Sequence, residues 1–290
     1  MSARGDVFLS CDAAAKACGA EGVASALEAA GIAPRRVGSR GMVWLEPLME
    51  IEIGGVRHAF GPMTPGEVAD VLADPAGHPK ALGPTEEIPF FAAQNRLTFA
   101  RCGRIEPLSL AEYEAEGGLS GLRRALALGP EGVVAEVTAS GLRGRGGAGF
   151  PTGIKWQTVA QATGARKYIV CNADEGDSGT FADRMLMEGD PFTLIEGMAI
   201  AGLAVGATKG FIYLRSEYPD AAEMLEAALT VARRAGLLGE SLLGAGPAFD
   251  IELRMGAGAY VCGEETSLLN SLEGKRGVVR AKPPLPAISG

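Results

Sequence analysis

The chain has 290 residues, of which 47% are hydrophobic, so its length predicts about two domains and its composition excludes general disorder. The formal net charge of −8 argues against nucleic acid as a main partner. No signal peptide is evident, the longest apolar run (residues 198–207) is about half of the roughly 20 residues that a membrane span needs, and five irregularly spaced cysteines indicate no disulfide framework, so we expect a cytoplasmic protein.

The first 80 residues predict a small domain with the element order βαβββα, which suits a thioredoxin-like fold. Gly54 and Gly55 mark a hairpin between its last two strands. The segment from Thr64 to Glu67 matches a capped start for its last helix. The strands are expected at residues 7–11, 43–45, 49–53 and 56–60, and the helices at residues 13–30 and 68–72.

A larger domain is expected at residues 119–290, after a linker and extended arm at residues 81–118. The linker region begins in a stretch rich in proline, glycine and alanine. In the larger domain, short apolar strands alternate with helices, which predicts a Rossmann-like, mainly parallel α/β sheet. Its strands are expected at residues 167–172, 209–215 and 249–254, and its helices at residues 130–142, 190–206, 219–235 and 264–272.

Residues 141–156, here called the glycine loop, are unusually rich in glycine and carry Arg143, Arg145 and Lys155. Glycines let the backbone approach a ligand closely, and inward-pointing amides beside cations form an anion site. Phe150 and Trp156 offer flat surfaces for a heteroaromatic ring. A mobile linker is the alternative, but linkers favour serine and small polar residues over these side chains. The loop therefore predicts nucleotide binding.

The spacing Gly144-x-Gly146-x-x-Gly149 also matches the dinucleotide fingerprint. That fingerprint requires a strand before it and a helix that opens on its last glycine. A helix is predicted before this loop, and Pro151 interrupts the expected helix start after it. We therefore do not expect a conventional Rossmann phosphate-binding turn.

An acidic loop, residues 173–180, directly follows the first predicted strand of the larger domain. Ligands of open α/β sheets lie beyond the carboxyl ends of the strands. Carboxylates accept hydrogen bonds from sugar hydroxyls, so we assign Asp174, Glu175 and Asp177 to ribityl or ribose hydroxyls. The alternative is an ordinary turn, in which aspartate and glycine are common.

A third loop, residues 255–266, follows the last predicted strand and contains Tyr260, Glu264 and Glu265. The two glutamates are expected beside a bound ring system, although carboxylates at a helix start can also be caps alone. A basic, proline-rich tail after residue 274 is expected to close over this site.

Both histidines, His58 and His78, lie in the small domain or linker, and no CxxC motif occurs. Hydrolysis by a Ser/His/Asp triad and a local metal site therefore have no support, and a bound cofactor is expected to carry the chemistry.

Three segments resemble the NADH-oxidising flavoprotein subunit of respiratory complex I and its relatives in NAD-reducing hydrogenases and formate dehydrogenases: the glycine loop, residues 171–184, and residues 256–274 with the basic, proline-rich stretch that follows. Residues 39–47, 86–91, 96–99 and 171–179 look like the β subunits of cytoplasmic, molybdenum-containing NAD-dependent formate dehydrogenases. The resemblance implies a subunit that exchanges hydride between NAD(H) and FMN and single electrons with iron–sulfur clusters during formate oxidation. A hydrogenase diaphorase, a complex I subunit and a non-catalytic scaffold are the alternatives.

The resemblance also implies roles for single residues. FMN contacts are expected from Gly144, Gly146, Lys155, Asn172, Asp174, Tyr260, Gly263 and Glu264, with Arg145 in the same cofactor-binding set. NAD contacts are expected from Gly147, Phe150, Glu175, Asp177, Glu265 and Lys282. Phe150 would stack on the adenine, and Glu175 and Glu265 are assigned the catalytic role. Leu285 stands where several relatives carry phenylalanine, so one stacking partner is expected to be missing.

The implied partners are a γ subunit that resembles a two-iron ferredoxin and a molybdenum-containing α subunit. The small domain lacks the cysteine quartet of a two-iron cluster, so no cluster is expected there. A four-iron four-sulfur cluster is expected only in a region beyond residue 290, and we expect the chain to be a fragment of a longer subunit.

Overall fold

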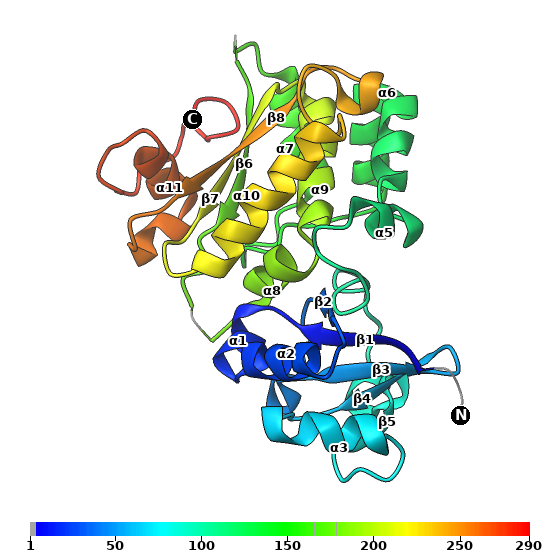
Figure 1. Cartoon of the computed structure of the whole chain (residues 1–290). Helices are drawn as coiled ribbons and strands as arrows, with labels where there is room; N and C mark the ends of the chain where they lie inside the picture. Colours follow the sequence, from blue (N-terminus) through cyan, green and yellow to red (C-terminus); the bar gives the residue numbers. More distant parts are fainter. Residues whose placement is uncertain (1–3, 165, 178) are drawn as a thin grey trace. The chain divides into compact units, whose positions relative to one another are not determined.

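The computed structural model describes residues 4–164, 166–177 and 179–290, and the chain divides into two compact units (Figure 1). The N-terminal unit extends through Glu112 and includes Met185–Asp190. The C-terminal unit comprises Tyr113–Arg184 and Pro191–Gly290. Residues 81–112, which we expected to form a linker and an arm, thus group with the N-terminal unit. Among the described residues, no helix has the length and apolar character needed to span a bilayer.

The N-terminal unit contains a mixed five-stranded sheet with the order β2-β1-β3-β4-β5. β1 pairs in parallel with β2 and antiparallel with β3, and the remaining neighbours are antiparallel. The expected βαβββα order of a thioredoxin-like fold is confirmed, and β5 follows it at the edge of the sheet. The strands are β1 (Arg4–Ser10), β2 (Arg35–Val37), β3 (Met49–Ile53), β4 (Val56–Phe60) and β5 (Ala81–Pro84); the helices are α1 (Ala13–Ala17), α2 (Ala20–Ala29), α3 (Val68–Ala73), α4 (Pro89–Ala92) and α5 (Leu110–Ala115), the last of which continues into the other unit.

Two local predictions in this unit were wrong. The expected helix at residues 13–30 is two helices, because Gly19 adopts a left-handed φ of 101° between α1 and α2. The expected strand at residues 43–45 is a 3-10 turn, and the second strand of the sheet is β2. β2 is hard to recognise because it is short and polar; its Arg35 pairs with carboxylates, including that of Glu106 at 2.7 Å.

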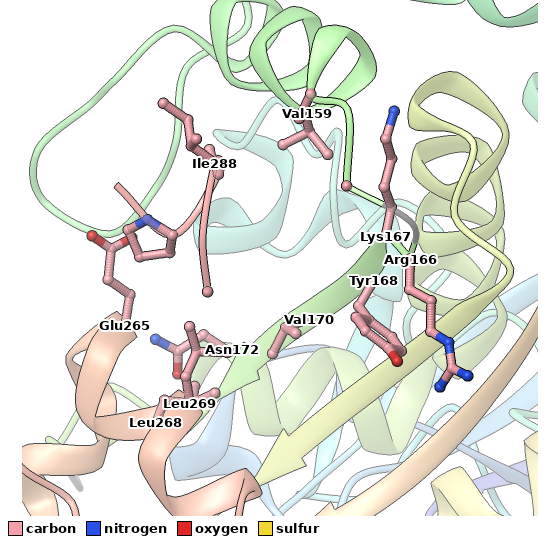
Figure 2. Close-up of a pocket in the computed structure, with 15 residues that line it drawn as sticks. Val159, Arg166, Lys167, Tyr168, Val170, Asn172, Glu265, Leu268, Leu269 and Ile288 are labelled. Carbon is pink, nitrogen blue, oxygen red and sulfur yellow. The ribbon is translucent and has the colours of Figure 1, made fainter. Parts of the chain in front are cut away.

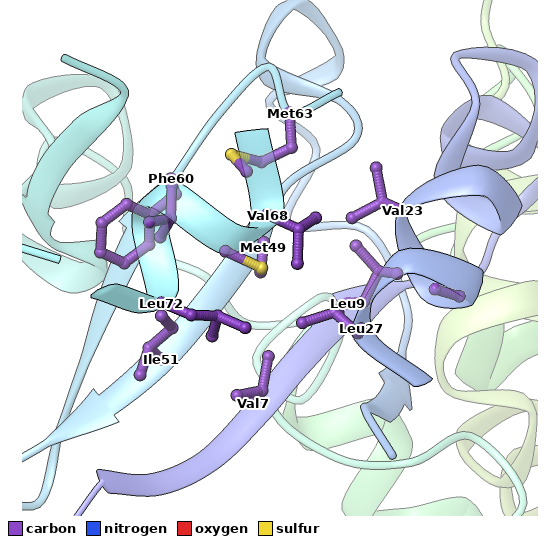
Figure 3. Packing of buried hydrophobic residues seen from close by; sticks show 12 residues of the cluster. Val7, Leu9, Val23, Leu27, Met49, Ile51, Phe60, Met63, Val68 and Leu72 are labelled. Atoms are coloured by element: carbon purple, nitrogen blue, oxygen red, sulfur yellow. The ribbon is translucent and has the colours of Figure 1, made fainter. Parts of the chain in front are cut away.

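The core of the N-terminal unit follows the periodicity of its elements (Figure 3). Strand residues two apart contribute to one face, and helix residues four apart contribute to the opposing face. The labelled cluster comprises Val7 and Leu9 of β1, Val23 and Leu27 of α2, Met49 and Ile51 of β3, Phe60 of β4, Met63, and Val68 and Leu72 of α3. Burial of these side chains stabilises the unit by about 1.5–3 kcal/mol for each large one.

Glu46 is a buried carboxyl in the same unit that accepts hydrogen bonds from the Ser39 hydroxyl (2.9 Å) and the Leu48 amide (2.8 Å). Burial and the nearby Asp12 carboxylate raise the pKa of Glu46 to about 7. In the unfolded chain a glutamate titrates near pH 4.3, so between these values the folded state holds a proton that the unfolded state has released. The stability that this proton brings is complete below about pH 4.3 and is lost as the pH rises through about 7.

We therefore expect Glu46→Gln to be more stable than the wild type at pH 8, with the difference shrinking toward pH 4. Urea unfolding midpoints would be followed by Trp44 fluorescence in a Trp156→Phe background, because Trp44 then reports on the N-terminal unit. A difference that is constant from pH 4 to pH 8 would contradict the prediction.

The C-terminal unit contains a three-stranded parallel sheet with the order β6-β7-β8. Helix α9 packs on β6 and β7, and α10 packs on both α9 and β8. The predicted parallel α/β architecture is confirmed (Figure 1). The strands are β6 (Tyr168–Ala173), β7 (Lys209–Leu214) and β8 (Asp250–Met255); the helices are α6 (Ser120–Ala139), α7 (Thr152–Gln161), α9 (Pro191–Val205), α10 (Pro219–Arg234) and α11 (Glu265–Leu272), with α8 (Ala182–Gly189) divided between the two units.

The glycine loop connects two helices, as the sequence predicted for its N-terminal side. Helix α6, which bends at Gly129, precedes it, so the order of strand, glycine turn and helix is not present here. The expectation that Pro151 would interrupt a helix start on the last glycine is confirmed, because α7 begins only at Thr152. Pro151 is the N-cap residue and has an extended conformation with ψ of 122°.

Candidate nucleotide-binding site

The carboxyl ends of β6, β7 and β8 bring three loops to one edge of the sheet. Parallel pairing places Ala173, Leu214 and Met255 in register, so the loops that follow them start side by side. The first is the acidic loop, the second is residues 215–218, and the third is residues 255–266, which end in the first turn of α11. This edge is where open α/β sheets bind ligands.

Direct contacts join the first and third loops. The Asn172 side-chain amide donates to the Gly263 carbonyl at 2.8 Å and accepts from the Asp174 amide at 3.2 Å. The Tyr260 ring lies so close to Gly176 that a Cβ there would stand 2.7 Å from it. Gly176 is therefore required for this approach, and the two loops behave as one wall of the site.

The second loop anchors the acidic loop through Glu175. The Tyr218 hydroxyl donates to the Glu175 carboxylate at 2.9 Å, and Arg215 donates to the Glu175 carbonyl. The same carboxylate accepts the amides of Asp183 (3.0 Å) and Arg184 (3.2 Å) at the start of α8. Glu175 is consequently buried, with its carboxylate turned into the protein.

Sequence reasoning missed Arg215 and Tyr218. The signal that could have found them is their position just after β7, the middle strand, since the same strand-end argument that selected the other two loops applies there. Glu217 of this loop lies 3.9 Å from the position that a Cβ would take on Gly258 of the third loop. All three loops are thus in mutual contact.

Removal of the Tyr218 hydroxyl is expected to loosen the acidic loop. A hydrogen bond to a charged group contributes about 1.5–3 kcal/mol, so Tyr218→Phe should speed amide exchange across residues 173–184 by about tenfold or more. Hydrogen exchange measured by mass spectrometry would test this, with Tyr168→Phe as a matched control, because the Tyr168 ring packs on Phe211 and is half exposed. Equal protection in both variants would show that the loop holds without Tyr218.

Two cavities adjoin the link between Asn172 and Gly263. One of about 490 Å³ is lined by Asp174, Gly176, Asp177, Tyr260, Val261, Gly263 and Glu264. The other, of about 370 Å³, is here called the apolar cavity because most of its lining residues are apolar, but Arg166, Lys167, Asn172 and Glu265 also line it. Figure 2 shows Val170 of β6 beside Leu268 and Leu269 of α11, with Val159 of α7 and Ile288 of the C-terminal segment across the cavity. A cavity lined by carboxylates beside one with both apolar and charged walls suits a ligand that combines hydroxyls with a ring system.

The carboxylates of the site differ in their environments. Burial raises the pKa of Asp174, with Glu217 adding to this and Arg215 opposing it, and its Oδ2 atom has no hydrogen-bond partner among the described residues. Burial opposes ionisation of Glu264 as well, but hydrogen bonds from Thr266, Ser267 and Lys282 lower the pKa of this carboxyl to about 2. Glu264 thus caps α11, which confirms the capping role that the sequence allowed for a glutamate at this helix start. Asp174, by contrast, lines the cavity and keeps one acceptor atom without a partner among the described residues.

Lys282 of the basic tail lies on both glutamates of the third loop. Its ammonium group donates to Glu264 at 3.1 Å and also to Glu265, and these bonds raise the pKa of Lys282. The backbone amide of Arg280 donates to the Thr266 hydroxyl at 2.9 Å, which binds the tail to α11. The tail therefore folds back over the start of α11.

The glycine loop precedes α7 and closes on itself. The Gly144 amide donates to the Phe150 carbonyl at 2.9 Å, and Arg143 donates to the Gly149 carbonyl. Gly146 and Gly147 are exposed, and a Cβ at either position would meet nothing within 4 Å. A ligand can therefore approach the backbone of these two glycines closely.

Lys155 of α7 lies beside the glycine loop. Its ammonium group lies 3.9 Å from the Cβ position of Gly144 and 5.9 Å from the centre of the Phe150 ring. Within the described parts of the chain, Lys155 forms no ion pair. A cation without a carboxylate partner beside an exposed glycine backbone and a helix start is a suitable site for phosphate.

The structure brings together some of the predicted site residues and leaves others apart. Asp174, Asp177, Tyr260, Gly263 and Glu264 share the polar cavity, and Asn172 and Glu265 share the apolar one. Gly144, Arg145, Gly146, Gly147, Phe150 and Lys155 belong to the glycine loop and line neither cavity. No cluster of three or more His, Cys, Asp or Glu side chains suited to a metal ion occurs among residues 4–164, 166–177 and 179–290.

The C-terminal unit has a parallel sheet with acidic loops at its strand ends, and it carries a glycine loop with Lys155, which forms no ion pair with the described residues. These features indicate a nucleotide-binding α/β domain. Residues 137–289 match the family Complex1_51K, described as the Nuo51 FMN-binding domain. Because the match covers more than half of the chain, the chain belongs to this family. The family description confirms the expectation that the cofactor is FMN.

Several known proteins are similar to the chain. The NADP-reducing hydrogenase subunit HndC of Solidesulfovibrio fructosivorans is 54% identical over 197 residues, which cover 68% of this chain and 40% of that protein. The mitochondrial NADH dehydrogenase [ubiquinone] flavoprotein 1 of Dictyostelium discoideum is 50% identical over 164 residues, or 56% of this chain and 34% of that protein. A crystal structure of an NAD+-reducing [NiFe]-hydrogenase in the H2-reduced state aligns with a TM-score of 0.54 at 30% identity, covering 97% of this chain and 48% of the other. The chain thus spans less than half the length of these relatives.

Proposed function

We propose that this chain is the FMN- and NAD(H)-binding part of a flavoprotein electron-transfer subunit. It would exchange hydride between NAD(H) and FMN and pass single electrons to iron–sulfur clusters. The observation that carries the proposal is the joined set of strand-end loops, with its polar and apolar cavities, in a chain whose family is the Nuo51 FMN-binding domain. NAD(H) as the nucleotide agrees with the names of the relatives, which are NADH- or NAD(P)-linked enzymes.

The residues present fit FMN. The open glycine positions and the unpaired Lys155 suit its phosphate, and the free Oδ2 of Asp174 suits a ribityl hydroxyl. Tyr260, Gly263 and Glu264 would complete the flavin side of the site, together with Asn172, Gly144, Gly146 and Arg145. When bound, FMN supplies hydride exchange with the nicotinamide and single-electron exchange with clusters; the protein's contribution is to bind and orient the rings.

For NAD(H) we propose contacts from Phe150, Gly147, Asp177, Glu265 and Lys282. Glu265 is the exposed glutamate of the third loop and faces the apolar cavity, so it is the proposed catalytic residue best placed to orient the nicotinamide amide. Glu175 is the second proposed catalytic residue. Its carboxylate accepts a hydrogen bond from the Tyr218 hydroxyl, and we propose that it acts by fixing the acidic loop. Lys282 would leave the two glutamates or bridge them to the ligand.

We further propose that the full subunit serves a cytoplasmic formate dehydrogenase that reduces NAD+. The support is the resemblance of residues 39–47, 86–91 and 96–99, which contact one another in the N-terminal unit: Arg40 pairs with Glu86 at 3.1 Å, and Arg96 donates to the Arg40 carbonyl at 2.9 Å. The partners would be a molybdenum-containing α subunit and a ferredoxin-like γ subunit. The four-iron cluster would belong to the part of the longer relatives that this chain does not cover.

A hydrogenase diaphorase is the second candidate. Two observations favour it: HndC is a hydrogenase subunit, and the hydrogenase structure aligns with 97% of the chain, including the N-terminal unit. A scaffold that keeps the fold without turnover is a third reading, and it differs from the others in predicting no functional flavin.

One experiment on the intact complex tests these readings. The complex would be isolated through an affinity tag on this subunit, and its absorption spectrum and metal content measured. A flavin band that NADH bleaches is expected, and its absence would overturn the proposed function. Molybdenum in the complex supports formate oxidation, whereas nickel identifies the hydrogenase reading.

A further inference from the structure

An exposed aromatic pair marks the surface of the N-terminal unit. Trp44 is 57% exposed and Phe90 is 47% exposed, and their rings stack edge to face with centroids 4.7 Å apart. Leu97 nearby in sequence is 89% exposed. None of these residues lies within the matched family range of 137–289, and the proposed electron-transfer site does not use them.

The residue after Phe90 lines a cavity of about 320 Å³. It is lined by Phe91, the buried neighbour of Phe90, and by Glu86, Ala92, Gln94, Arg96, Ala100 and Arg104. The Arg96 guanidinium lies over the Phe91 ring at 4.5 Å, and Arg40 lies over it at 5.4 Å. Phe90 and Phe91 are consecutive residues of α4, so this short helix contributes to both the aromatic pair and the cavity. We call Trp44, Phe90, Phe91, Arg96, Leu97 and Arg104 the docking patch.

Arg96 is the cation of the patch without a carboxylate partner among the described residues. Its guanidinium donates to the Arg40 carbonyl at 2.9 Å and lies on Phe91, and burial lowers its pKa. By contrast, Arg40 pairs with Glu50 and Arg104 pairs with Glu86. A half-buried guanidinium without a counter-ion favours an anion that would enter the cavity.

The arginines at the patch are held in place before any partner binds. Arg40 and Glu50 form a buried ion pair at 3.0 Å, and Glu86 joins Arg40 (3.1 Å) to Arg104 (2.9 Å). Arginine side chains that are already fixed lose little conformational entropy on binding. Tryptophan, other aromatic residues and arginine are also the residue types that dominate binding energy at protein interfaces.

We propose that the docking patch binds an acidic segment of a partner subunit, with a carboxylate paired to Arg96 and an apolar side chain resting on Trp44 and Phe90. A polyanion or an anionic membrane would require several unpaired cations, whereas here one is unpaired and Glu86 and Glu87 lie beside it. The charge and the aromatic surface therefore fit a protein segment. This inference does not depend on the cofactor chemistry.

The test uses the intact complex isolated through a tag on this subunit. Trp44→Ala/Phe90→Ala and Arg96→Glu should each lower the amount of one co-purifying subunit per tagged chain by about tenfold, measured by quantitative mass spectrometry. Val56→Ala, another exposed apolar residue of the N-terminal unit, and Arg234→Glu, an exposed arginine of α10, are the matched controls. Circular dichroism melting would verify that each variant is folded. Unchanged stoichiometry in folded patch variants would overturn the proposal.

A photo-crosslink identifies the occupant. With p-benzoylphenylalanine at position 44 of the complex, the expected product joins this chain to a segment of another subunit that contains Asp or Glu. Crosslinks to a second copy of this chain, or to none of the co-purifying subunits, would contradict the proposal. Flavin content is measured on the same samples, so loss of docking is distinguished from failure of the proposed function.

Discussion

Replacement of Lys155 by alanine is expected to leave the purified protein largely without flavin. Lys155 lies beside the glycine loop and has no ion-pair partner in the described parts of the chain. A charge-assisted hydrogen bond to phosphate contributes about 1.5–3 kcal/mol. Its loss should weaken FMN retention roughly 10- to 100-fold. The measurement is flavin released per chain on denaturation, together with NADH-to-ferricyanide activity, which should fall in proportion.

Two controls make this result specific. Lys275→Ala removes an exposed lysine that pairs with Glu273, and it should retain its flavin. Excess free FMN should restore activity to Lys155→Ala, because the variant lacks affinity and keeps the strand-end loops. If Lys155→Ala holds a full complement of flavin, the glycine loop is not the phosphate site. If the variant still assembles into the complex and the wild type carries no flavin, the chain is a scaffold subunit.

The sequence predicted the fold well where burial follows a simple period. In β6 and β7 continuous apolar runs indicate strands, and both were predicted to within a residue at each end. The expectation that β6 is a buried strand was wrong, because β6 lies at the edge of the three-stranded sheet and only its Ala173 is buried. The prediction failed where tertiary contacts override local preference. β2 consists of two arginines and a valine and forms a strand because β1 offers it a parallel edge. At Gly19 one left-handed residue divides a helix whose composition favours continuity.

The candidate site was predictable in its parts and less so in its assembly. Strand-end position and residue type were enough to select the carboxylates Asp174 and Glu264 from the sequence. Side-chain direction was not accessible in the same way. Glu175 turns inward because Tyr218, from a loop 43 positions away, supplies its hydrogen-bond donor. Such a pairing leaves no local pattern in the sequence, and the roles of the individual contact residues stay predictions.

The buried ion pair under the docking patch gives the largest expected change in stability. Glu50 accepts from the Arg40 guanidinium at 3.0 and 3.2 Å, and both side chains are almost completely buried. Glu50→Ala would leave the charge of Arg40 in the core with less compensation, so the free energy of unfolding of the N-terminal unit should fall by about 3–5 kcal/mol. Urea unfolding followed by Trp44 fluorescence in a Trp156→Phe background measures it.

The control and a second variant separate the possible causes. Glu52→Ala alters the same strand at a carboxylate that forms no ion pair with the described residues, and it should change stability by less than about 0.5 kcal/mol. Arg40→Met with Glu50→Leu removes both charges of the buried pair, and apolar replacement of such a pair is often neutral or stabilising, so part of the lost stability should return. The rest reflects Arg57, which also pairs with Glu50 at 3.4 Å. If Glu50→Ala is as stable as the wild type, Glu86 alone must neutralise Arg40. The frame that holds Arg96 in the docking patch would then rest on an exposed carboxylate, and docking should weaken at high salt.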